Sequence, residues 1–111
     1  MFIPYARQSI SDQDIAAVSE VLRSDFLTQG PGIPAFETAI ATYCGAKHAV
    51  AVNSATSALH IACLALGVGP GDIVWTNPIS FVASSNCALY CGAKVEFVDI
   101  DPDTFNISVA A

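Results

Sequence analysis

Residues 49–66 read AVAVNSATSALHIACLAL. The first part, Ala49–Val52, is a short apolar run that predicts a buried strand ending at Asn53. Small and polar residues follow, and Ala58–Leu66 is then apolar almost all round, which is typical of a buried helix. The stretch therefore predicts a strand and a helix joined by a short polar corner, the unit from which parallel α/β sheets are built.

The same alternation continues along the chain. After a glycine-rich turn at 67–72, Ile73–Thr76 predicts another strand, Phe81–Tyr90 another helix and Val95–Ile100 a third strand. This alternation, with strands spaced by roughly 22 residues, predicts parallel βαβ units whose helices cover the sheet. No terminating element is expected over 104–111.

Two further helices are expected before the sheet. Ser11, followed by acidic residues, is a typical helix start, and apolar residues recur at helical spacing from there to Arg23. Pro34 can begin a second helix, for which Gly45 is the natural stop.

Length and composition limit the fold class. The chain has 111 residues, enough for one domain at most, which we divide into a helical arm with a loop at 1–45 and a partial α/β domain at 46–111. Apolar residues make up 53% and charged residues 13%, which excludes intrinsic disorder. So apolar a short chain is expected to be part of a larger protein or to have an obligate partner.

Charge and hydropathy exclude several classes of partner. The net charge is −6, and the four basic residues are scattered, so neither a nucleic acid nor an anionic membrane is an expected partner. No apolar run is long enough to span a membrane, and the first residues do not resemble a signal peptide. We therefore expect a cytoplasmic protein.

The cysteines do not have the spacing of a metal site. No pair forms a C-x-x-C motif, and no histidine stands at zinc-ligand spacing, so we predict no bound metal. In a reducing cytosol we expect buried free thiols. The four are Cys44, Cys63, Cys87 and Cys91.

The corner at residues 53–57 has the chemistry of a phosphate-binding turn. A helix that begins after a buried strand presents free N–H groups and the positive end of its dipole. Ser54, Thr56 and Ser57 add hydroxyl donors, and Ala55 lets an anion approach closely. An ordinary helix N-cap explains the same residues equally well.

The corner at residues 77–83 follows the next strand, so both corners could face one crevice at the carboxyl end of the sheet. Phe81 could stack there on a flat ring, although taken alone it is more often a core residue. The loop at 25–32 could be functional or a plain connector. Tyr5, before the first helix, could contact a ligand or be solvated.

Taken together, these segments resemble the DegT/StrS-type family of pyridoxal phosphate (PLP)-dependent sugar aminotransferases. The match runs from about Ile3 to Thr104. It is carried by Leu27–Pro31, Phe36–Glu37, Gly45–Ala49, Asn53–His60, Ala65–Asp72, Ile79–Ala83 and Gly92–Asp101. The form NSATS, with LTQG before it, is most similar to the branch that aminates a UDP-linked 4-keto-6-deoxy sugar on the way to pseudaminic acid.

The resemblance implies a fold and a set of binding residues. The fold would be the N-terminal part of the large domain of a fold-type I PLP-dependent transferase, with a parallel-rich sheet and flanking helices. The corner would bind the cofactor phosphate through Ala55, Thr56 and Ser57, and Phe81 would stack on the pyridine ring. The nucleotide-sugar site would be lined by Tyr5, Asp25, Phe26, Leu27 and Thr28.

The resemblance also implies a reaction. A homodimer with active sites at the subunit interface would transfer an amino group, from glutamate, to the keto carbon of a UDP-linked sugar. In the family, the lysine that forms the Schiff base with PLP lies beyond residue 111, and so does the aspartate that pairs with the pyridine nitrogen. Lys47 and Lys94 precede the expected strands, at the end of the sheet away from the corners. We therefore expect no catalytic residue in this chain and no activity of the chain alone.

Two alternatives remain open. A relative of the same fold dehydrates the sugar, with a histidine in place of the Schiff-base lysine. The chain could also be a non-catalytic fragment that binds a partner chain.

Overall fold

The computed structural model describes residues 3–111, so the first two residues of the predicted arm lie outside the described part. The chain forms two compact units, an N-terminal unit up to Ala51 and a C-terminal unit at Val52–Ala111. The N-terminal unit holds α1 (Asp12–Arg23) and α2 (Gly32–Cys44). The C-terminal unit holds α3 (Ala55–Ala65), β1 (Ile73–Thr76), α4 (Ala83–Tyr90) and β2 (Lys94–Phe97).

The start of α1 and the end of α2 lie where the sequence predicts them. Before α1, the Ser11 hydroxyl accepts a hydrogen bond from the Asp14 N–H (3.3 Å), and the Asp14 carboxylate accepts one from the Ser11 N–H (2.7 Å). This reciprocal pair is a capping box. At the end of α2, Gly45 adopts a left-handed conformation with φ of 64°, and the Ala46 N–H donates to the Ala41 carbonyl (2.9 Å).

The predicted strand at Ala49–Val52 is wrong, because these residues form no ladder with another strand of the described chain. A strand exists only when its N–H and C=O groups pair with a neighbouring strand. Here the Ala51 N–H donates instead to the Glu37 carboxylate of α2, at 2.8 Å. The apolar pattern of Ala49–Val52 is that of a strand, but the described residues supply no neighbouring strand for it to pair with.

The other two strands form the predicted parallel pair. In the sheet β1 lies beside β2 in parallel, with Ile73 opposite Lys94 and Thr76 opposite Phe97. The ladder extends by one bond from the Val98 N–H to the Thr76 carbonyl (2.9 Å). A parallel pair needs a crossover, and α4 provides it, which confirms the predicted βαβ unit.

The last strand is shorter than predicted, and the segment after it is folded rather than featureless. β2 ends at Phe97, and an antiparallel bridge joins Ile100 to Ile107. Between them the Asp101 carboxylate accepts hydrogen bonds from the N–H of Asp103 (3.0 Å) and from the N–H (2.8 Å) and hydroxyl (3.0 Å) of Thr104. This is an Asx turn that closes the bridge.

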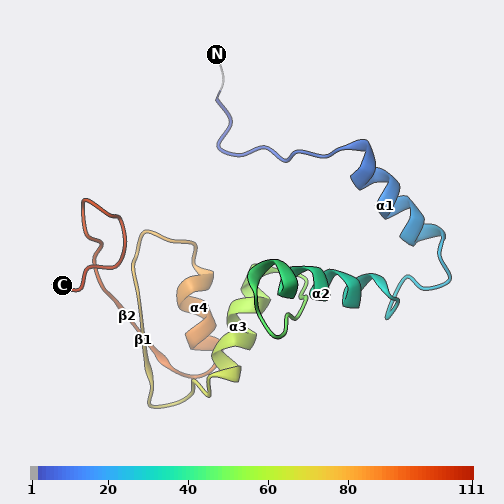
Figure 1. Cartoon of the computed structure of the whole chain (residues 1–111). Helices are drawn as coiled ribbons and strands as arrows, with labels where there is room; N and C mark the ends of the chain where they lie inside the picture. The colour runs from blue at the N-terminus through green and yellow to red at the C-terminus, as the bar shows by residue number, and fades with distance from the viewer. Residues whose placement is uncertain (1–2) are drawn as a thin grey trace. The chain divides into compact units, whose positions relative to one another are not determined.

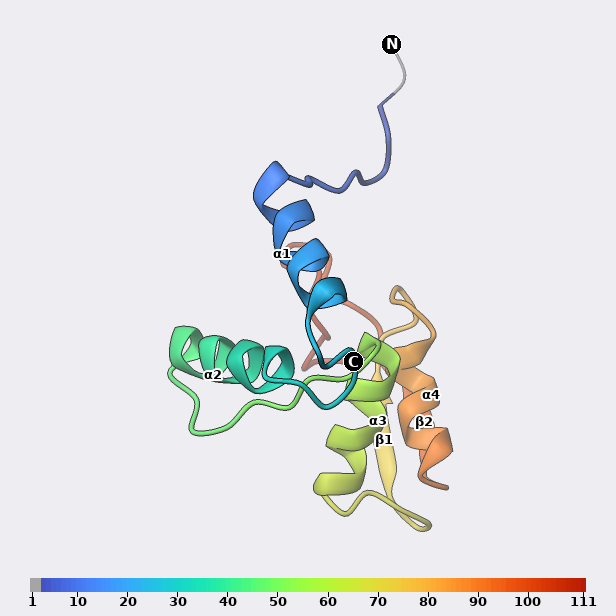
Figure 2. The ribbon, with the colours of Figure 1, turned by 90° about the vertical axis from the view of Figure 1, so that its right-hand side faces the viewer.

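The two helices of the C-terminal unit run in the same direction. Figures 1 and 2 show the N-termini of α3 and α4 at one end of the unit, the end at which β1 finishes. α4 packs on α3 and on both strands. The buried residues of the described chain are small, namely Ala83, Cys87, Ala88 and Ala93.

α3 is not the buried helix that its sequence predicts. None of its residues is buried, and Leu59, Ile61 and Leu64 are 40%, 47% and 55% exposed. Burial of a helix that is apolar all round requires neighbours on every side. The described residues supply the helix α4 as a neighbour, and the remaining apolar surface of α3 stays open.

We expect Gly92→Ala to destabilise the C-terminal unit. Gly92 ends α4 with φ of +80°, and an added Cβ would lie 3.3 Å from Pro70 Cγ. Forcing an L-residue into this conformation costs about 1–2 kcal/mol, which a urea melt followed by helical circular dichroism would detect. Gly69→Ala is the matched control, because its Cβ would meet nothing closer than 3.8 Å. Equal midpoints for the two variants would contradict this assignment.

We expect the Asx turn to loosen in acid. Its hydrogen bonds from Thr104 and Asp103 lower the pKa of Asp101 below its ordinary value of 3.8. Because the folded-state pKa is depressed, the stabilisation is present above the unfolded-state pKa and is lost as the pH falls through the folded-state value. Carboxyl NMR titration should give Asp101 a pKa below 3.8, and Thr104→Val should raise it. An unchanged titration in Thr104→Val would refute this role of Thr104.

Candidate functional site

The first corner is a capped helix N-terminus. Ser54 is in an extended conformation, and its hydroxyl accepts a hydrogen bond from the Ser57 N–H (3.2 Å). The Ser57 hydroxyl donates to the Asn53 side-chain oxygen (2.8 Å). The N-cap interpretation is therefore correct for Ser54, and the corner is ordered by its own side chains.

This cap leaves the first two amides of α3 without an intrahelical acceptor. Ala55 and Thr56 occupy those positions, where the positive end of the helix dipole adds to their N–H groups. Ala55 is exposed and Thr56 half-buried, so an anion can reach both amides. The Ser57 hydroxyl proton is already directed at Asn53, so Ser57 would have to turn it away to bind an anion.

The second corner surrounds a cavity of about 230 Å³. Its lining includes Asn77 and Ser80 from the corner, Ser84 from α4 and Phe97 from β2. The Ser80 and Ser84 hydroxyls lie 3.0 Å apart and are hydrogen-bonded. Phe81 also lines the cavity and is 75% exposed, so in this structure it is not the core residue that its type alone favours.

Asn77 carries an unsatisfied polar atom that the sequence analysis missed. Its side-chain oxygen is buried and has no hydrogen-bond partner among the described residues. An unpaired buried acceptor costs about 1–3 kcal/mol, so a donor that is absent from this structure is expected to reach it. The position of Asn77 directly after β1 was the one sequence signal for a functional residue. The burial of its oxygen depends on the packing around it, so it could not be predicted.

The two corners lie at the same end of the C-terminal unit. Both precede the N-termini of α3 and α4, which Figures 1 and 2 place together at the carboxyl end of β1. Lys94 lies at the opposite end, since it begins β2 beside Ile73, the first residue of β1. This arrangement agrees with the rule that open α/β sheets bind ligands beyond the carboxyl ends of their strands.

The predicted sugar-site residues belong to the N-terminal unit. Tyr5 is fully exposed, and Phe26 and Leu27 are exposed as well. The loop from Asp25 to Thr28 is ordered locally, because the Ser24 hydroxyl donates to the Val21 carbonyl (2.7 Å) and accepts from the Phe26 N–H (3.4 Å). Their predicted role is not tested by these contacts and stays a prediction.

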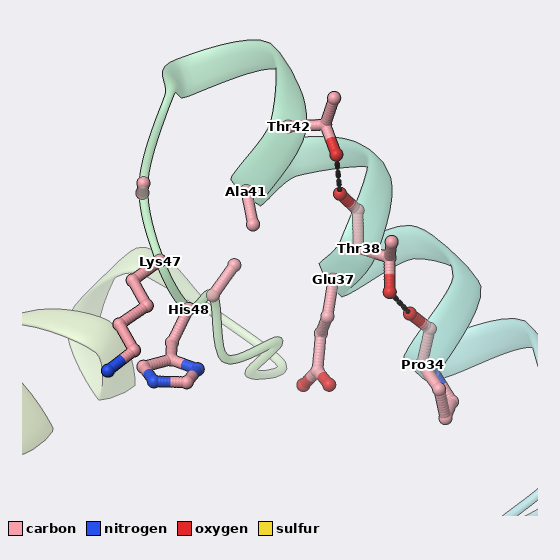
Figure 3. Close-up of a pocket in the computed structure, with 9 residues that line it drawn as sticks. Pro34, Glu37, Thr38, Ala41, Thr42, Lys47 and His48 are labelled. Carbon is pink, nitrogen blue, oxygen red and sulfur yellow. Dashed lines mark hydrogen bonds between the residues drawn. The ribbon is translucent and has the colours of Figure 1, made fainter.

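A hollow of about 380 Å³ lies between α2 and residues 46–49 (Figure 3). Figure 3 shows the side chains of Lys47 and His48 on one side of it and that of Glu37 on the other. One carboxylate oxygen of Glu37 binds the Ala51 N–H, so this side chain has a structural role, which the sequence analysis did not assign. The hollow is a groove of the N-terminal unit alone.

The donor set of the first corner fits the phosphate of PLP. Two free amides at a helix N-terminus, with a hydroxyl on Thr56, are the groups that bind a dianion in such turns. At the second corner, the exposed ring of Phe81 beside an open cavity fits a flat aromatic ring. The residues present therefore suit the cofactor that the resemblance implies.

The described part of the chain lacks two further features. Residues 3–111 contain no cluster of three or more His, Cys, Asp or Glu side chains placed to bind a metal ion. Within the same residues, no helix has the length and apolar character that crossing a membrane requires.

Comparison with known proteins matches nearly the whole chain. Residues 8–111 match the DegT/DnrJ/EryC1/StrS aminotransferase family. The spore coat polysaccharide biosynthesis protein SpsC of Bacillus subtilis (strain 168) is 46% identical over 106 residues, which cover 96% of this chain and 27% of SpsC. A UDP-4-amino-4,6-dideoxy-N-acetyl-beta-L-altrosamine transaminase of Campylobacter jejuni is 48% identical over 101 residues, covering 91% of this chain and 27% of the transaminase.

Solved structures agree with the sequence relatives. Spr1654 of Streptococcus pneumoniae in its PLP-form superposes with a TM-score of 0.89 and 35% identity, over 96% of this chain and 27% of that one. The fold is thus part of the fold of PLP-dependent aminotransferases. The chain spans about 27% of the length of the curated relatives that it matches. With its family model, its relatives and its fold in agreement, the chain belongs to the DegT/DnrJ/EryC1/StrS aminotransferase family.

Proposed function

We propose that this chain is the cofactor-binding and substrate-binding N-terminal part of a PLP-dependent aminotransferase that acts on a UDP-linked 4-keto-6-deoxy sugar. The observation that carries the proposal is the first corner, whose free amides at Ala55 and Thr56 suit the cofactor phosphate. The exposed ring of Phe81, two residues before the first residue of α4, supports it.

The names of the relatives support the substrate class. Two of them are named as aminotransferases of UDP-linked amino sugars, one from Campylobacter jejuni and one, 44% identical, from Shewanella sediminis (strain HAW-EB3). The sugar on the pathway to pseudaminic acid is the substrate we favour, because the NSATS and LTQG segments resemble that branch most. We further propose glutamate as amino donor, a homodimer as the working assembly and the cytoplasm as its location.

Each named residue has a physical task in this proposal. The amides of Ala55 and Thr56 bind the phosphate, and the dipole of α3 stabilises its charge. Phe81 orients the ring by stacking on one face. When bound, PLP supplies the electron sink that makes amino transfer possible. Tyr5 and residues 25–28 contribute one wall of the sugar-nucleotide site.

The chain holds two lysines, and neither is placed for the chemistry of the cofactor. Lys94 begins β2, at the end of the sheet opposite the corners, and Lys47 lies in the N-terminal unit. A transaminase needs a lysine amine at the reacting carbon to move its proton. We therefore propose that these 111 residues bind the cofactor and do not catalyse the transfer by themselves.

We expect Thr56→Val to weaken binding of PLP to the chain by about tenfold, because it removes one hydrogen bond to a charged phosphate. Equilibrium dialysis would measure the affinity. Thr42→Val is the matched control, since the Thr42 hydroxyl donates to the Thr38 carbonyl within α2 (2.8 Å) and has no role in the corner. Phe81→Leu should weaken binding and Phe81→Tyr should preserve it. Equal affinities for the chain and Thr56→Val would contradict the phosphate assignment.

We expect no site-specific attachment of PLP to lysine in this chain. Borohydride reduction followed by peptide mass spectrometry would trap any such bond. Stoichiometric labelling of Lys47 or Lys94 at low PLP concentration would overturn the proposal that the chain is inactive alone. Labelling that is low and equal at the two lysines would agree with it, because exposed amines react weakly and without preference.

A further inference from the structure

The hollow of the N-terminal unit has two walls of opposite hydrogen-bonding character. One wall is α2, which contributes Glu37 and Thr38, and the other is the segment after α2, which contributes Lys47 and His48 (Figure 3). The hollow has a volume of about 380 Å³, and its lining residues all belong to this unit. It includes none of the residues of the two corners, which belong to the C-terminal unit.

The polar side chains on α2 present acceptors. Glu37 is half-buried, and one oxygen of its carboxylate accepts a hydrogen bond from the Ala51 N–H (2.8 Å), which holds the group in place and leaves its second oxygen available. The Thr38 hydroxyl donates its proton to the Pro34 carbonyl (2.8 Å), so the Thr38 oxygen is left as an acceptor. Both groups can bind a donor, and the carboxylate favours one that is positively charged.

The opposite wall presents donors. Lys47 carries an ammonium group with three N–H donors and no acceptor, and the ring of the neighbouring His48 can donate from a nitrogen. Both side chains are exposed. Among the residues drawn in Figure 3, no hydrogen bond joins either of them to Glu37. Because Glu37 is held by Ala51, the opposite charges of Glu37 and Lys47 lie on opposite sides of the hollow without forming a pair.

We propose that this hollow is a binding site for a free α-amino acid with a small apolar side chain. The carboxylate of the ligand accepts hydrogen bonds from Lys47 and His48, and its ammonium group donates to Glu37 and Thr38. A simple anion would leave the charge of Glu37 unmatched, and a simple cation would leave that of Lys47 unmatched, so a ligand with both charges fits best. Small apolar residues also line the hollow, namely Pro34, Ala41, Ala46 and Ala49. They suit a short aliphatic side chain.

The test is titration of the 111-residue chain with L-alanine, followed through the amide signals in two-dimensional NMR. We expect saturable shifts at residues 46–49 and at Glu37 and Thr38. N-acetyl-L-alanine lacks the ammonium group, and L-alanine amide lacks the carboxylate, so each should bind about tenfold more weakly than L-alanine. If N-acetyl-L-alanine bound as tightly as L-alanine, the hollow would be a plain anion site and the proposal would be wrong.

Two substitutions each remove the charge of one wall. Glu37→Gln keeps an oxygen that can accept from the Ala51 N–H, and Lys47→Met keeps a long side chain, so the amide spectrum of each free variant should show the same fold. Each should weaken binding of L-alanine by about tenfold. Lys94→Met is the matched control, because it makes the same change in the C-terminal unit, and it should leave the affinity unchanged.

Three further results would overturn the proposal. The first is a set of shifts that do not saturate with L-alanine. The second is a loss of affinity in Lys94→Met as large as that in Lys47→Met. The third is an unchanged affinity in a Glu37→Gln variant that keeps the amide spectrum of the parent chain.

Discussion

The parallel pairing of β1 with β2 is the constraint on which the C-terminal unit depends. Two parallel strands cannot be joined by a hairpin, so the chain must cross over between them, and α4 makes this crossover. The crossover places the carboxyl end of β1 and the N-terminus of α4 at one end of the unit. Because α3 packs beside α4 in the same direction, its N-terminus lies at that end too (Figure 1). The common position of the two corners is thus a consequence of one strand pairing.

Features with a local physical cause could be predicted from the sequence. The start of α1 at Ser11 and the stop of α2 at Gly45 depend on side chains and backbone angles within a few residues. The strand at Ala49–Val52 could not, because a strand depends on a partner distant in sequence. The exposed surface of α3 was missed for the same reason, since hydropathy predicts a need for burial but not whether neighbours meet it.

The candidate site also combines features that could be predicted from the sequence with features that could not. The types of chemistry could be predicted, because small hydroxyl residues at a helix start and an aromatic after a strand have few physical uses. Three details could not: the Ser57 hydroxyl is engaged by Asn53, the oxygen of Asn77 is buried without a partner, and the ring of Phe81 is exposed. Each depends on contacts in three dimensions that no spacing of residues encodes.

The open surfaces and the unpaired Asn77 oxygen have one common explanation. The buried core consists of three alanines and one cysteine, so burying it contributes little transfer free energy. Ordering the backbone costs about 1–2 kcal/mol for each residue, which is far more in sum. A larger apolar surface is exposed, made up of Leu59, Ile61 and Leu64 on α3 and Phe81 at the second corner. Covering this surface would contribute much more free energy. The match covers 27% of SpsC, so most of that relative lies outside the matched part. A protein surface that covered this apolar area and donated a hydrogen bond to the Asn77 oxygen would complete the core and the site in one event.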